Sequence, residues 1–336
     1  MQTRQLGTLW PVSALTLGGG GLGQIWGETT REEAIATVHM AVERGITLLD
    51  LAPLYGRGES EQVVGAAFEG QWPADLRVAT KCMIGRQYFG GIYERLEASL
   101  LRSLKTLRRS HVDLLFSHSN ICPDDYVYRG EVEYQAFATV PLSIYESELV
   151  PAFEKLKAKG LIGDWGLTGT GLPRTVMDVI RGEQKPAVIQ AVANLMDSAG
   201  GLRRYEEPAE PRNIIRTAKN NDIGVMGIRA VQAGALTRAI DRPLPDDDPE
   251  TRDFVKAAPY RALAAELGED PAELAHAYAL AIEGVDTLVL GVKNRTELAA
   301  ALQSEARGPL DPEIIRRIEA LGLRRQVPRI PLDAPL

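Results

Sequence analysis

Short apolar runs alternate along this chain with longer segments in which apolar residues recur every three or four positions. A short apolar run predicts a buried β-strand, and the three-to-four spacing predicts an amphipathic helix. The predicted strands cover residues 15–17, 46–49, 77–80, 112–116, 161–167, 187–192, 223–228 and 285–290. The predicted helices lie at residues 30–44, 60–68, 92–107, 149–159, around 176–180 and 214–218, and at 296–303 and 312–321.

Eight strand–helix units in strict alternation imply parallel strands joined by crossovers. Such a sheet either stays open and doubly wound or closes on itself. The count of eight favours closure, so we predict an α/β fold of the (β/α)8 TIM barrel type, with its chemistry at the C-terminal ends of the strands. A short N-terminal hairpin at residues 5–12 would cap the bottom of the barrel, and an extra C-terminal helix would follow the last unit.

No linker rich in Pro, Gly or Ser divides the chain, so one catalytic domain over residues 1–336 is predicted. Three additions to the barrel are expected. They are a long loop after the fourth strand (119–147), a loop and helix insertion after the seventh (229–270) and a C-terminal tail (322–336).

Composition narrows the classes of function. A net charge of −7 and no basic stripe argue against binding nucleic acid. Two cysteines suit a reducing compartment, and the absence of an export signal or a long apolar run predicts a cytoplasmic protein without a membrane partner. The four histidines form no cluster with cysteine or carboxylates, so no metal site is expected. The oligomeric state stays open.

Four polar side chains lie at or just beyond the ends of successive predicted strands: Asp50, Tyr55, Lys81 and His118. Carbonyl reduction needs a proton donor, and a nearby Lys81 ammonium would lower the high pKa of a Tyr55 phenol. Asp50 would hold Lys81 charged. His118 would hydrogen-bond the substrate oxygen and orient it.

Each of these residues also has a plainer interpretation. Asp50 could cap a turn, Tyr55 could be a loop aromatic, and His118 could be structural. Lys81 could be solvated, or it could form a Schiff base in an aldolase. Their occurrence together on adjacent strand ends favours catalysis.

The segment from Gly45 to Asp50, with Tyr55 five residues later and the run at 55–65, resembles the aldo-keto reductase family in its bacterial members. Lys81 and His118 match the rest of that family's catalytic tetrad. The resemblance implies a nicotinamide-dependent oxidoreductase that interconverts an aldehyde or ketone and the alcohol, with Tyr55 as general acid and base.

The glycine run at residues 18–23 fits the dinucleotide pattern G-x-G-x-x-G, which requires a helix to start at the last glycine. The next predicted helix begins only at Thr30, so a Rossmann site is not expected. Gly20 and Gly21 instead allow the backbone to lie close under a flat ring, and the family also has glycine at this strand end.

The resemblance places the nicotinamide across the barrel mouth. It implies contacts from Thr168, Gln190 and Asn194 near the fifth and sixth strands. After the seventh strand, where the family has an aromatic residue and Ser-Pro-Leu, this chain has Ile228 and Arg229, then Gly234 and Leu236. Arg229 could clamp the pyrophosphate, or it could pair at the surface with the aspartates at 246–248.

After the eighth strand, a helix start offers backbone N–H groups to an anion. The candidate residues there are Gly291, Lys293, Asn294, Arg295 and Glu297. Glu297 stands where the family often has an arginine for the 2′-phosphate of NADP, and it also forms a capping box with Asn294. An acid at this position repels a phosphate and favours NAD(H), whereas Lys293 and Arg295 could still bind the phosphate. The phosphate preference is open, with NADP(H) as the expected cofactor and NAD(H) as a serious alternative.

The substrate is expected to be a small carbonyl or sugar-like molecule. Tyr126, Tyr128, Tyr134 and Tyr145 in the 119–147 segment could wall its pocket, or they could pack outside the barrel. Two other functions remain open: a Schiff-base aldolase that uses Lys81, and a barrel subunit that senses a nucleotide without catalysis.

Overall fold

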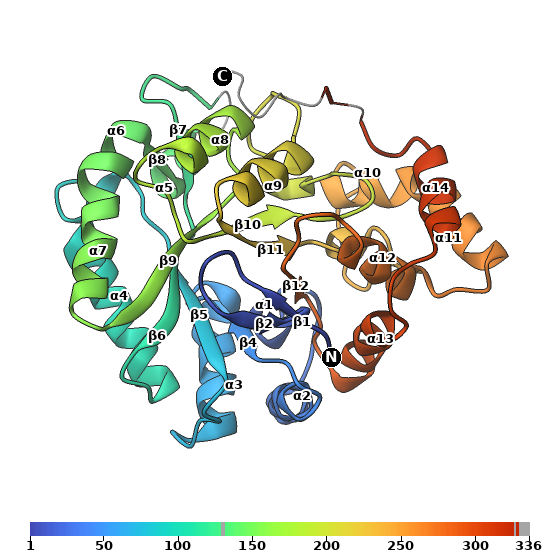
Figure 1. The fold of residues 1–336 in the computed structure, drawn as a ribbon, viewed down its shortest axis with the longest axis horizontal. Helices are drawn as coiled ribbons and strands as arrows, with labels where there is room; N and C mark the ends of the chain where they lie inside the picture. The colour runs from blue at the N-terminus through green and yellow to red at the C-terminus, as the bar shows by residue number, and fades with distance from the viewer. Residues whose placement is uncertain (129–131, 326, 329–336) are drawn as a thin grey trace.

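The computed structural model describes residues 1–128, 132–325 and 327–328. Its centre is a closed barrel of eight parallel strands, which confirms the predicted (β/α)8 fold and excludes the open sheet (Figure 1). In order around the barrel the strands are β3 (Leu15–Gly18), β4 (Leu48–Asp50), β5 (Arg77–Cys82), β6 (Val112–Ser117), β9 (Ile162–Thr168), β10 (Val188–Val192), β11 (Gly224–Ile228) and β12 (Thr287–Leu290).

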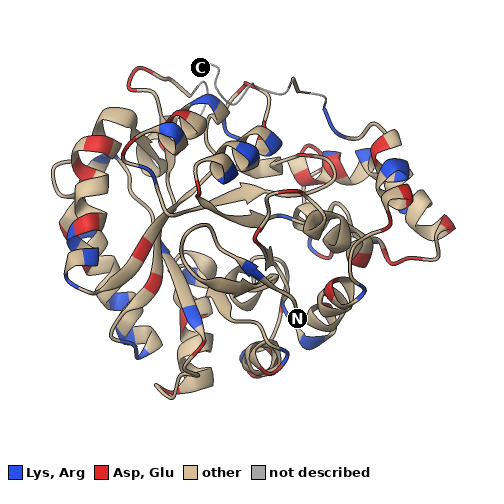
Figure 2. Ribbon diagram, viewed as in Figure 1, with Lys and Arg blue, Asp and Glu red and all other residues tan. Residues whose placement is uncertain are grey.

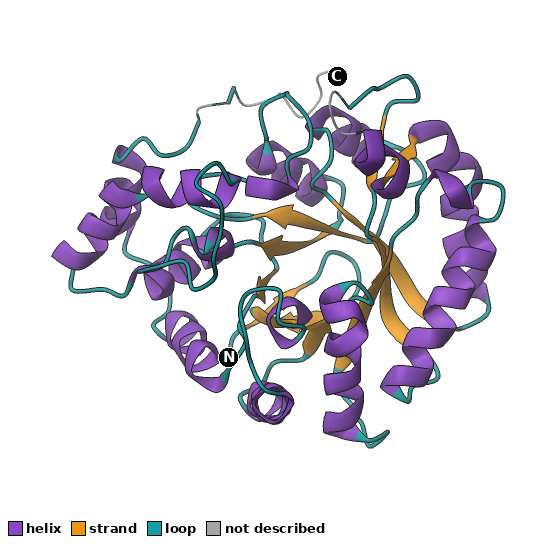
Figure 3. Cartoon of the chain, turned by 180° about the vertical axis from the view of Figure 1, so that it is seen from behind, coloured by secondary structure: helices purple, strands orange, loops and turns teal. Residues whose placement is uncertain are grey.

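Helices surround the strands on the outside (Figure 3). The helices predicted from apolar spacing are present with shifts of a few residues at their ends. They are α2 (Arg31–Glu43), α3 (Glu59–Phe68), α4 (Ile92–Leu107), α7 (Val150–Ala158), α8 (Pro173–Arg181), α9 (Pro211–Asn220), α13 (Arg295–Ala306) and the C-terminal α14 (Pro312–Ala320). A further helix, α12 (Pro271–Leu280), was not predicted. Basic and acidic residues are interspersed around this ring of helices (Figure 2).

The ends of α2 follow the predicted signals. The Thr30 hydroxyl accepts a hydrogen bond from the Glu33 N–H, and Gly45 has a φ of +89° just after the helix. The second half of the predicted capping box is replaced, because the Glu33 carboxylate accepts hydrogen bonds from Arg295 on α13. This contact ties the first and last helices of the ring together.

The predicted hairpin at the N-terminus is confirmed. Strands β1 (Thr3–Gln5) and β2 (Pro11–Ser13) pair in antiparallel register. Leu6 and Val12 are fully buried against side chains from inside the barrel. The hairpin therefore closes the N-terminal end of the barrel, and the C-terminal end stays available for a site.

The glycine run differs from its prediction. Residues Gly19–Leu22 form a single helical turn, α1, although no helix was expected before Thr30. Gly23 ends this turn instead of opening a helix. The Rossmann pattern needs a helix that starts at its last glycine, so it is still not met. A Cβ on Gly23 would come within 2.7 Å of the Tyr55 backbone, and one on Gly21 within 2.0 Å of the Val292 oxygen. Close backbone packing therefore explains these glycines.

The described part of the segment after β6 contains more regular secondary structure than the long loop that was predicted. Its strands β7 (Asn120–Cys122) and β8 (Thr139–Pro141) form a small parallel sheet. The same segment carries α5 (Val132–Ala138), α6 (Leu142–Ile144) and a π-helical turn, η3 (Tyr145–Leu149).

The segment after β11 carries a short turn and two helices. They are η5 (Gln232–Gly234), α10 (Pro249–Lys256) and α11 (Ala258–Glu266). The C-terminal tail reaches α9, where Asn213 Nδ2 donates to the Pro328 carbonyl at 3.1 Å. The rest of the predicted tail, residues 326 and 329–336, lies outside the described residues.

Three features of the described residues bear on the expectations from composition. Cys82 and Cys122 are both free and buried. No helix among the described residues is both long and apolar enough to cross a membrane. No group of three or more His, Cys, Asp and Glu side chains in the described ranges is placed to hold a metal ion.

Candidate active site

A buried ion pair lies at the C-terminal end of the barrel. Lys81 on β5 is 1% exposed and Asp50 at the end of β4 is 2% exposed. Lys81 Nζ donates to Asp50 Oδ1 at 2.7 Å and to the Leu51 carbonyl at 3.0 Å. Because β4 and β5 are neighbours in parallel register, the barrel itself brings these two side chains together.

Tyr55 and His118 complete the cluster. Tyr55 starts a short turn, η1 (Tyr55–Gly58), and Lys81 Nζ lies 4.8 Å from the centroid of its ring. The His118 ring follows β6 and meets the Tyr55 ring edge to face, with 5.6 Å between centroids. All four residues singled out in the sequence therefore lie together.

The ammonium of Lys81 is held in its charged form. Burial lowers the pKa of Lys81, but the Asp50 carboxylate and Tyr55 raise it by more, so the pKa lies above its ordinary value. Gln190 on β10 supports the same carboxylate, because its Nε2 donates to Asp50 Oδ1 at 2.9 Å.

The pKa of the Tyr55 phenol differs from the expectation. Burial raises the pKa of Tyr55, and this effect outweighs the Lys81 charge, which lowers it. Lys81 thus acts in the expected direction, but the expected net lowering of the pKa of Tyr55 is wrong because burial outweighs it. Tyr55 is protonated near neutral pH, which is the form that can donate a proton.

The imidazole of His118 is neutral. Burial, together with the charge of Lys81, lowers the pKa of His118 to about 3. Its Nδ1 is buried and has no hydrogen-bond partner among the described residues. A neutral ring with an unused nitrogen suits a hydrogen bond to a ligand.

The turn after Tyr55 has unusual backbone geometry. Gly56, Arg57 and Gly58 have φ values of +62°, +55° and +95°. Three successive left-handed residues reverse the chain within one turn and lead directly into α3. This geometry fixes Tyr55 at the mouth while α3 packs outside the barrel.

The residues expected near a nicotinamide ring already form hydrogen bonds or pack within the protein. Thr168 Oγ1 donates to the Ser117 carbonyl at 3.1 Å. Asn194 is fully buried, and its Nδ2 donates to Ser198 O and Arg229 O. Ile228 ends β11, Gly234 has a φ of +97° in η5, and Leu236 is buried.

Trp26 is a residue of the mouth that the sequence reasoning missed. A Cβ on Gly20 would lie 2.7 Å from Trp26 Nε1, and one on Gly291 would lie 3.2 Å from it. The indole thus covers two of the glycines expected near the cofactor. The guanidinium groups of Arg242 and Arg229 lie 5.3 and 6.0 Å from the centroid of its ring. The occurrence of a tryptophan shortly after the glycine run could have indicated this residue of the mouth from the sequence.

Arg229 does not pair with the aspartates at 246–248, which corrects that alternative. Its side chain is buried, forms an ion pair with Glu250 on α10 and donates to the Ala199 carbonyl. The Nε atom has no partner among the described residues. Part of the hydrogen-bonding capacity of this guanidinium is therefore unused.

The start of α13 is rich in charge pairs. The Lys293 ammonium contacts the carboxylates of both Asp241 and Glu297. Arg295 pairs with Glu33 at 2.8 Å. Asn294 caps the helix by accepting a hydrogen bond from the Glu297 N–H at 2.9 Å, as the capping pattern predicts.

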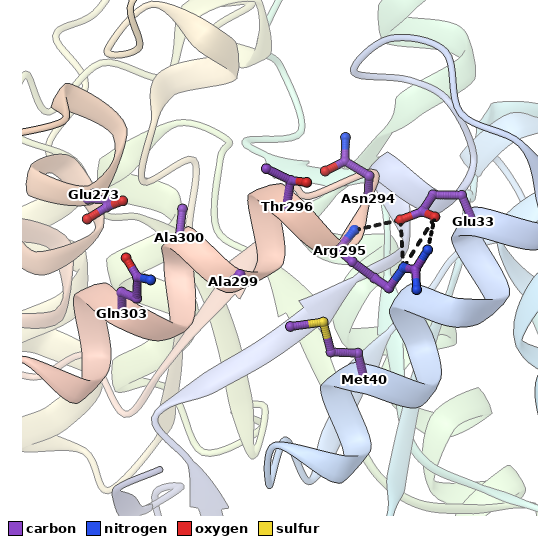
Figure 4. Close-up of a pocket in the computed structure, with 9 residues that line it drawn as sticks. All are labelled: Glu33, Met40, Glu273, Asn294, Arg295, Thr296, Ala299, Ala300 and Gln303. Atoms are coloured by element: carbon purple, nitrogen blue, oxygen red, sulfur yellow. Dashed lines mark hydrogen bonds and ion pairs between the residues drawn. The ribbon is translucent and has the colours of Figure 1, made fainter.

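A shallow pocket of about 750 Å³ lies outside the barrel beside this helix start (Figure 4). The Arg295–Glu33 pair and Met40 form one side of it, and small side chains of α13 form its floor. The lining residues are Glu33, Met40, Glu273, Asn294, Arg295, Thr296, Ala299, Ala300 and Gln303.

The four tyrosines of the segment after β6 have two different locations. Tyr145 packs near Trp165 on the outside of the barrel and donates to the Gln184 carbonyl. Tyr128 is buried in a separate cluster with Cys122, Leu172 and Tyr205, and Tyr126 and Tyr134 pack against that cluster. Tyr145 is therefore not part of a pocket wall.

Comparisons with known proteins bear on the family of the chain. The family model described as the aldo/keto reductase family matches residues 14–322. The L-galactose dehydrogenase of Arabidopsis thaliana is 26% identical over 328 residues, which cover 96% of this chain and 94% of that protein.

Two solved structures share the fold over almost the whole chain. An aldo-keto reductase from Bacillus halodurans in its holo form has a TM-score of 0.68 at 23% identity, covering 96% of both chains. A glycerol dehydrogenase from Gluconobacter oxydans has a TM-score of 0.66 at 22% identity, covering 95% of this chain and 94% of the other.

Replacement of His118 by glutamine should flatten the dependence of stability on pH. Below pH 6.5 the unfolded chain protonates this histidine while the folded protein keeps it neutral until about pH 3, so stability falls as the pH falls. Urea unfolding at pH 7 and pH 5 should show that the wild type loses on the order of 1–2 kcal/mol more than the variant. Equal losses would show that His118 titrates normally in the folded state.

Proposed function

Because this chain belongs to the aldo/keto reductase family, we propose that it moves a hydride between a nicotinamide cofactor and a substrate carbonyl carbon, with Tyr55 moving the proton. The family match makes the protein an oxidoreductase that acts on carbonyl or alcohol compounds. The observation that carries the proposal is the charged Lys81 beside the Tyr55 ring.

In the reducing direction, negative charge grows on the substrate oxygen and the Tyr55 phenol donates its proton there. The phenolate that forms lies beside the Lys81 ammonium, which stabilises it in a water-poor site. Asp50 keeps that ammonium charged and in place. In the oxidising direction the same groups accept the proton from an alcohol.

His118 serves a different purpose. Its neutral ring can hydrogen-bond the substrate oxygen without adding a positive charge next to Lys81. This contact fixes the oxygen near Tyr55 and so orients the carbon for hydride transfer.

The aldolase alternative gains no support from the geometry. Schiff-base formation needs a neutral amine, whereas Asp50 raises the pKa of Lys81 and both Asp50 and Leu51 accept its protons. A barrel that only senses a nucleotide would not require these four residues to converge. We therefore favour catalysis.

The mouth of the barrel fits a nicotinamide group. Gly20 and Gly291 have no side chains of their own, and the Arg229 guanidinium lies 6.0 Å from the Trp26 ring that covers them. Thr168, Gln190, Asn194 and Ile228 would surround the ring, which supplies or accepts the hydride when it is bound. Trp26 would have to share or leave its place over the two glycines.

The adenosine end of the cofactor would lie along the start of α13, near the pocket of Figure 4. There the cations Lys293 and Arg295 already pair with Asp241, Glu297 and Glu33. Three carboxylates against two cations leave an excess of negative charge, which opposes a 2′-phosphate. We therefore place NAD(H) ahead of NADP(H), the reverse of the order expected from the sequence.

We propose a sugar-like substrate. The relative from Arabidopsis thaliana is named as an L-galactose dehydrogenase and covers nearly the whole chain. The hydroxyl of Tyr134 accepts from Asn120 Nδ2 at 2.6 Å, which links this tyrosine to the segment that follows β6. Two free buried cysteines suit the expected cytoplasmic location.

The conservative variant Tyr55→Phe should abolish turnover and leave cofactor binding nearly unchanged. It removes the proton donor and keeps the ring beside Lys81 and His118. We expect the turnover number to fall at least ~10²-fold, with the dissociation constant for NADH, measured by fluorescence, unchanged within about 2-fold. The assay would use aldehydes, ketones and sugars such as L-galactose. Retained turnover would remove Tyr55 from its role.

Replacing Glu297 by glutamine should strengthen NADPH binding selectively. The change removes one negative charge near the proposed phosphate position and releases Lys293 from one partner. The dissociation constant for NADPH should fall ~3- to 10-fold, and that for NADH should stay the same. The matched control is Glu313→Gln, which removes an exposed charge from the distant α14. Equal effects of both variants on NADPH, or no effect of either, would contradict the proposed charge discrimination.

A further inference from the structure

Glu61 is a buried acid that the mechanism above does not use. It lies in α3, is 3% exposed and accepts a hydrogen bond from Thr80 Oγ1 at 2.6 Å. The hydroxyl of Ser103 on α4 also hydrogen-bonds its carboxyl group. Burial of a carboxyl group is unfavourable without such partners, so the contacts are needed for Glu61 to occupy this place.

The hydrogen bond between Thr80 and Glu61 matters because of where Thr80 lies on β5. Thr80 and Lys81 are consecutive on β5, so their side chains point to opposite faces of the barrel wall. Thr80 faces outward and meets Glu61. Lys81 faces inward and meets Asp50. The hydrogen bond to Glu61 therefore holds the same stretch of strand that presents the ammonium.

Glu61 also lies close to Tyr55 along the chain. The turn that carries Tyr55 leads directly into α3, and Glu61 is the third residue of that helix. The pairing of β4 with β5 includes a bond from the Leu51 N–H to the Ala79 carbonyl at 2.8 Å, after which the chain leaves the sheet. Beyond that point, the placement of Tyr55 relative to β5 depends on how α3 is anchored.

We propose that Glu61 is a positioning residue that sets the spacing between Tyr55 and Lys81 by tying α3 to β5 through Thr80. The inference rests on the proposed function, because the spacing matters only if these two groups share a proton. Glu61 acts from behind the barrel wall and touches neither substrate nor cofactor. Its loss should therefore lower the rate of the chemical step and leave binding nearly unchanged.

The test compares Glu61→Leu, Glu61→Gln and Thr80→Val in the wild-type assay. Glu61→Leu should lower kcat ~10- to 100-fold, because a small misplacement of reacting groups has effects of this size. KM and the dissociation constant for NADH should change less than about 3-fold. Glu61→Gln should recover kcat to within about 3-fold of the wild type, because its amide oxygen still accepts from Thr80.

Thr80→Val removes only the hydroxyl, so it carries the test if Glu61→Leu fails to fold. Its matched control is Thr287→Val, which removes an equally buried hydroxyl that bonds Thr16 at 2.7 Å between β12 and β3. Thr80→Val should lower kcat, and Thr287→Val should lower only the unfolding temperature.

Three results would overturn the proposal: wild-type kcat in Thr80→Val, equal loss of kcat in Thr287→Val, or Glu61→Gln as slow as Glu61→Leu. Absence of turnover in the wild type across the substrate panel is a different failure, because it contradicts the proposed function itself.

Discussion

The ion pair between Lys81 and Asp50 is the constraint on which the rest of the site depends. An ammonium removed from water persists only where a carboxylate and other acceptors replace its hydration. Asp50 and the Leu51 carbonyl meet this need at the end of the barrel, and Gln190 holds Asp50 by donating a hydrogen bond to its carboxylate. In the proposed mechanism, the charge held there makes a proton on Tyr55 transferable, so the ion pair would link the stability of the fold to the chemistry.

The barrel makes this arrangement possible by bringing together residues far apart in the chain. Gln190 lies 140 positions after Asp50, yet their side chains hydrogen-bond because β4 and β10 belong to one closed ring. The hairpin with Leu6 and Val12 fills the opposite end of the barrel. One end is therefore packed and apolar, and the other can hold buried polar groups that respond to a ligand.

Sequence patterns predicted most of the fold and all four residues of the central cluster. The strands and helices repeat with clear periods, and Asp50, Lys81 and His118 lie at or just after strand ends, where alternating β and α segments place functional groups. The α1 turn was missed because glycine is a weak helix former, and here packing against Tyr55 and Val292 outweighs propensity. The Glu250 partner of Arg229 and the direction of the pKa of Tyr55 depend on tertiary burial, which periodicity does not contain.

A double-mutant cycle of Asp50→Asn and Lys81→Met, followed by urea unfolding, tests the central ion pair most directly. Each single variant leaves one buried group without its charged partner and should lower the unfolding free energy by about 3 kcal/mol or more. The double variant should be more stable than the sum of the two losses predicts, by at least about 2 kcal/mol. Additive losses would contradict the account, because they would show that Asp50 does not hold the Lys81 charge.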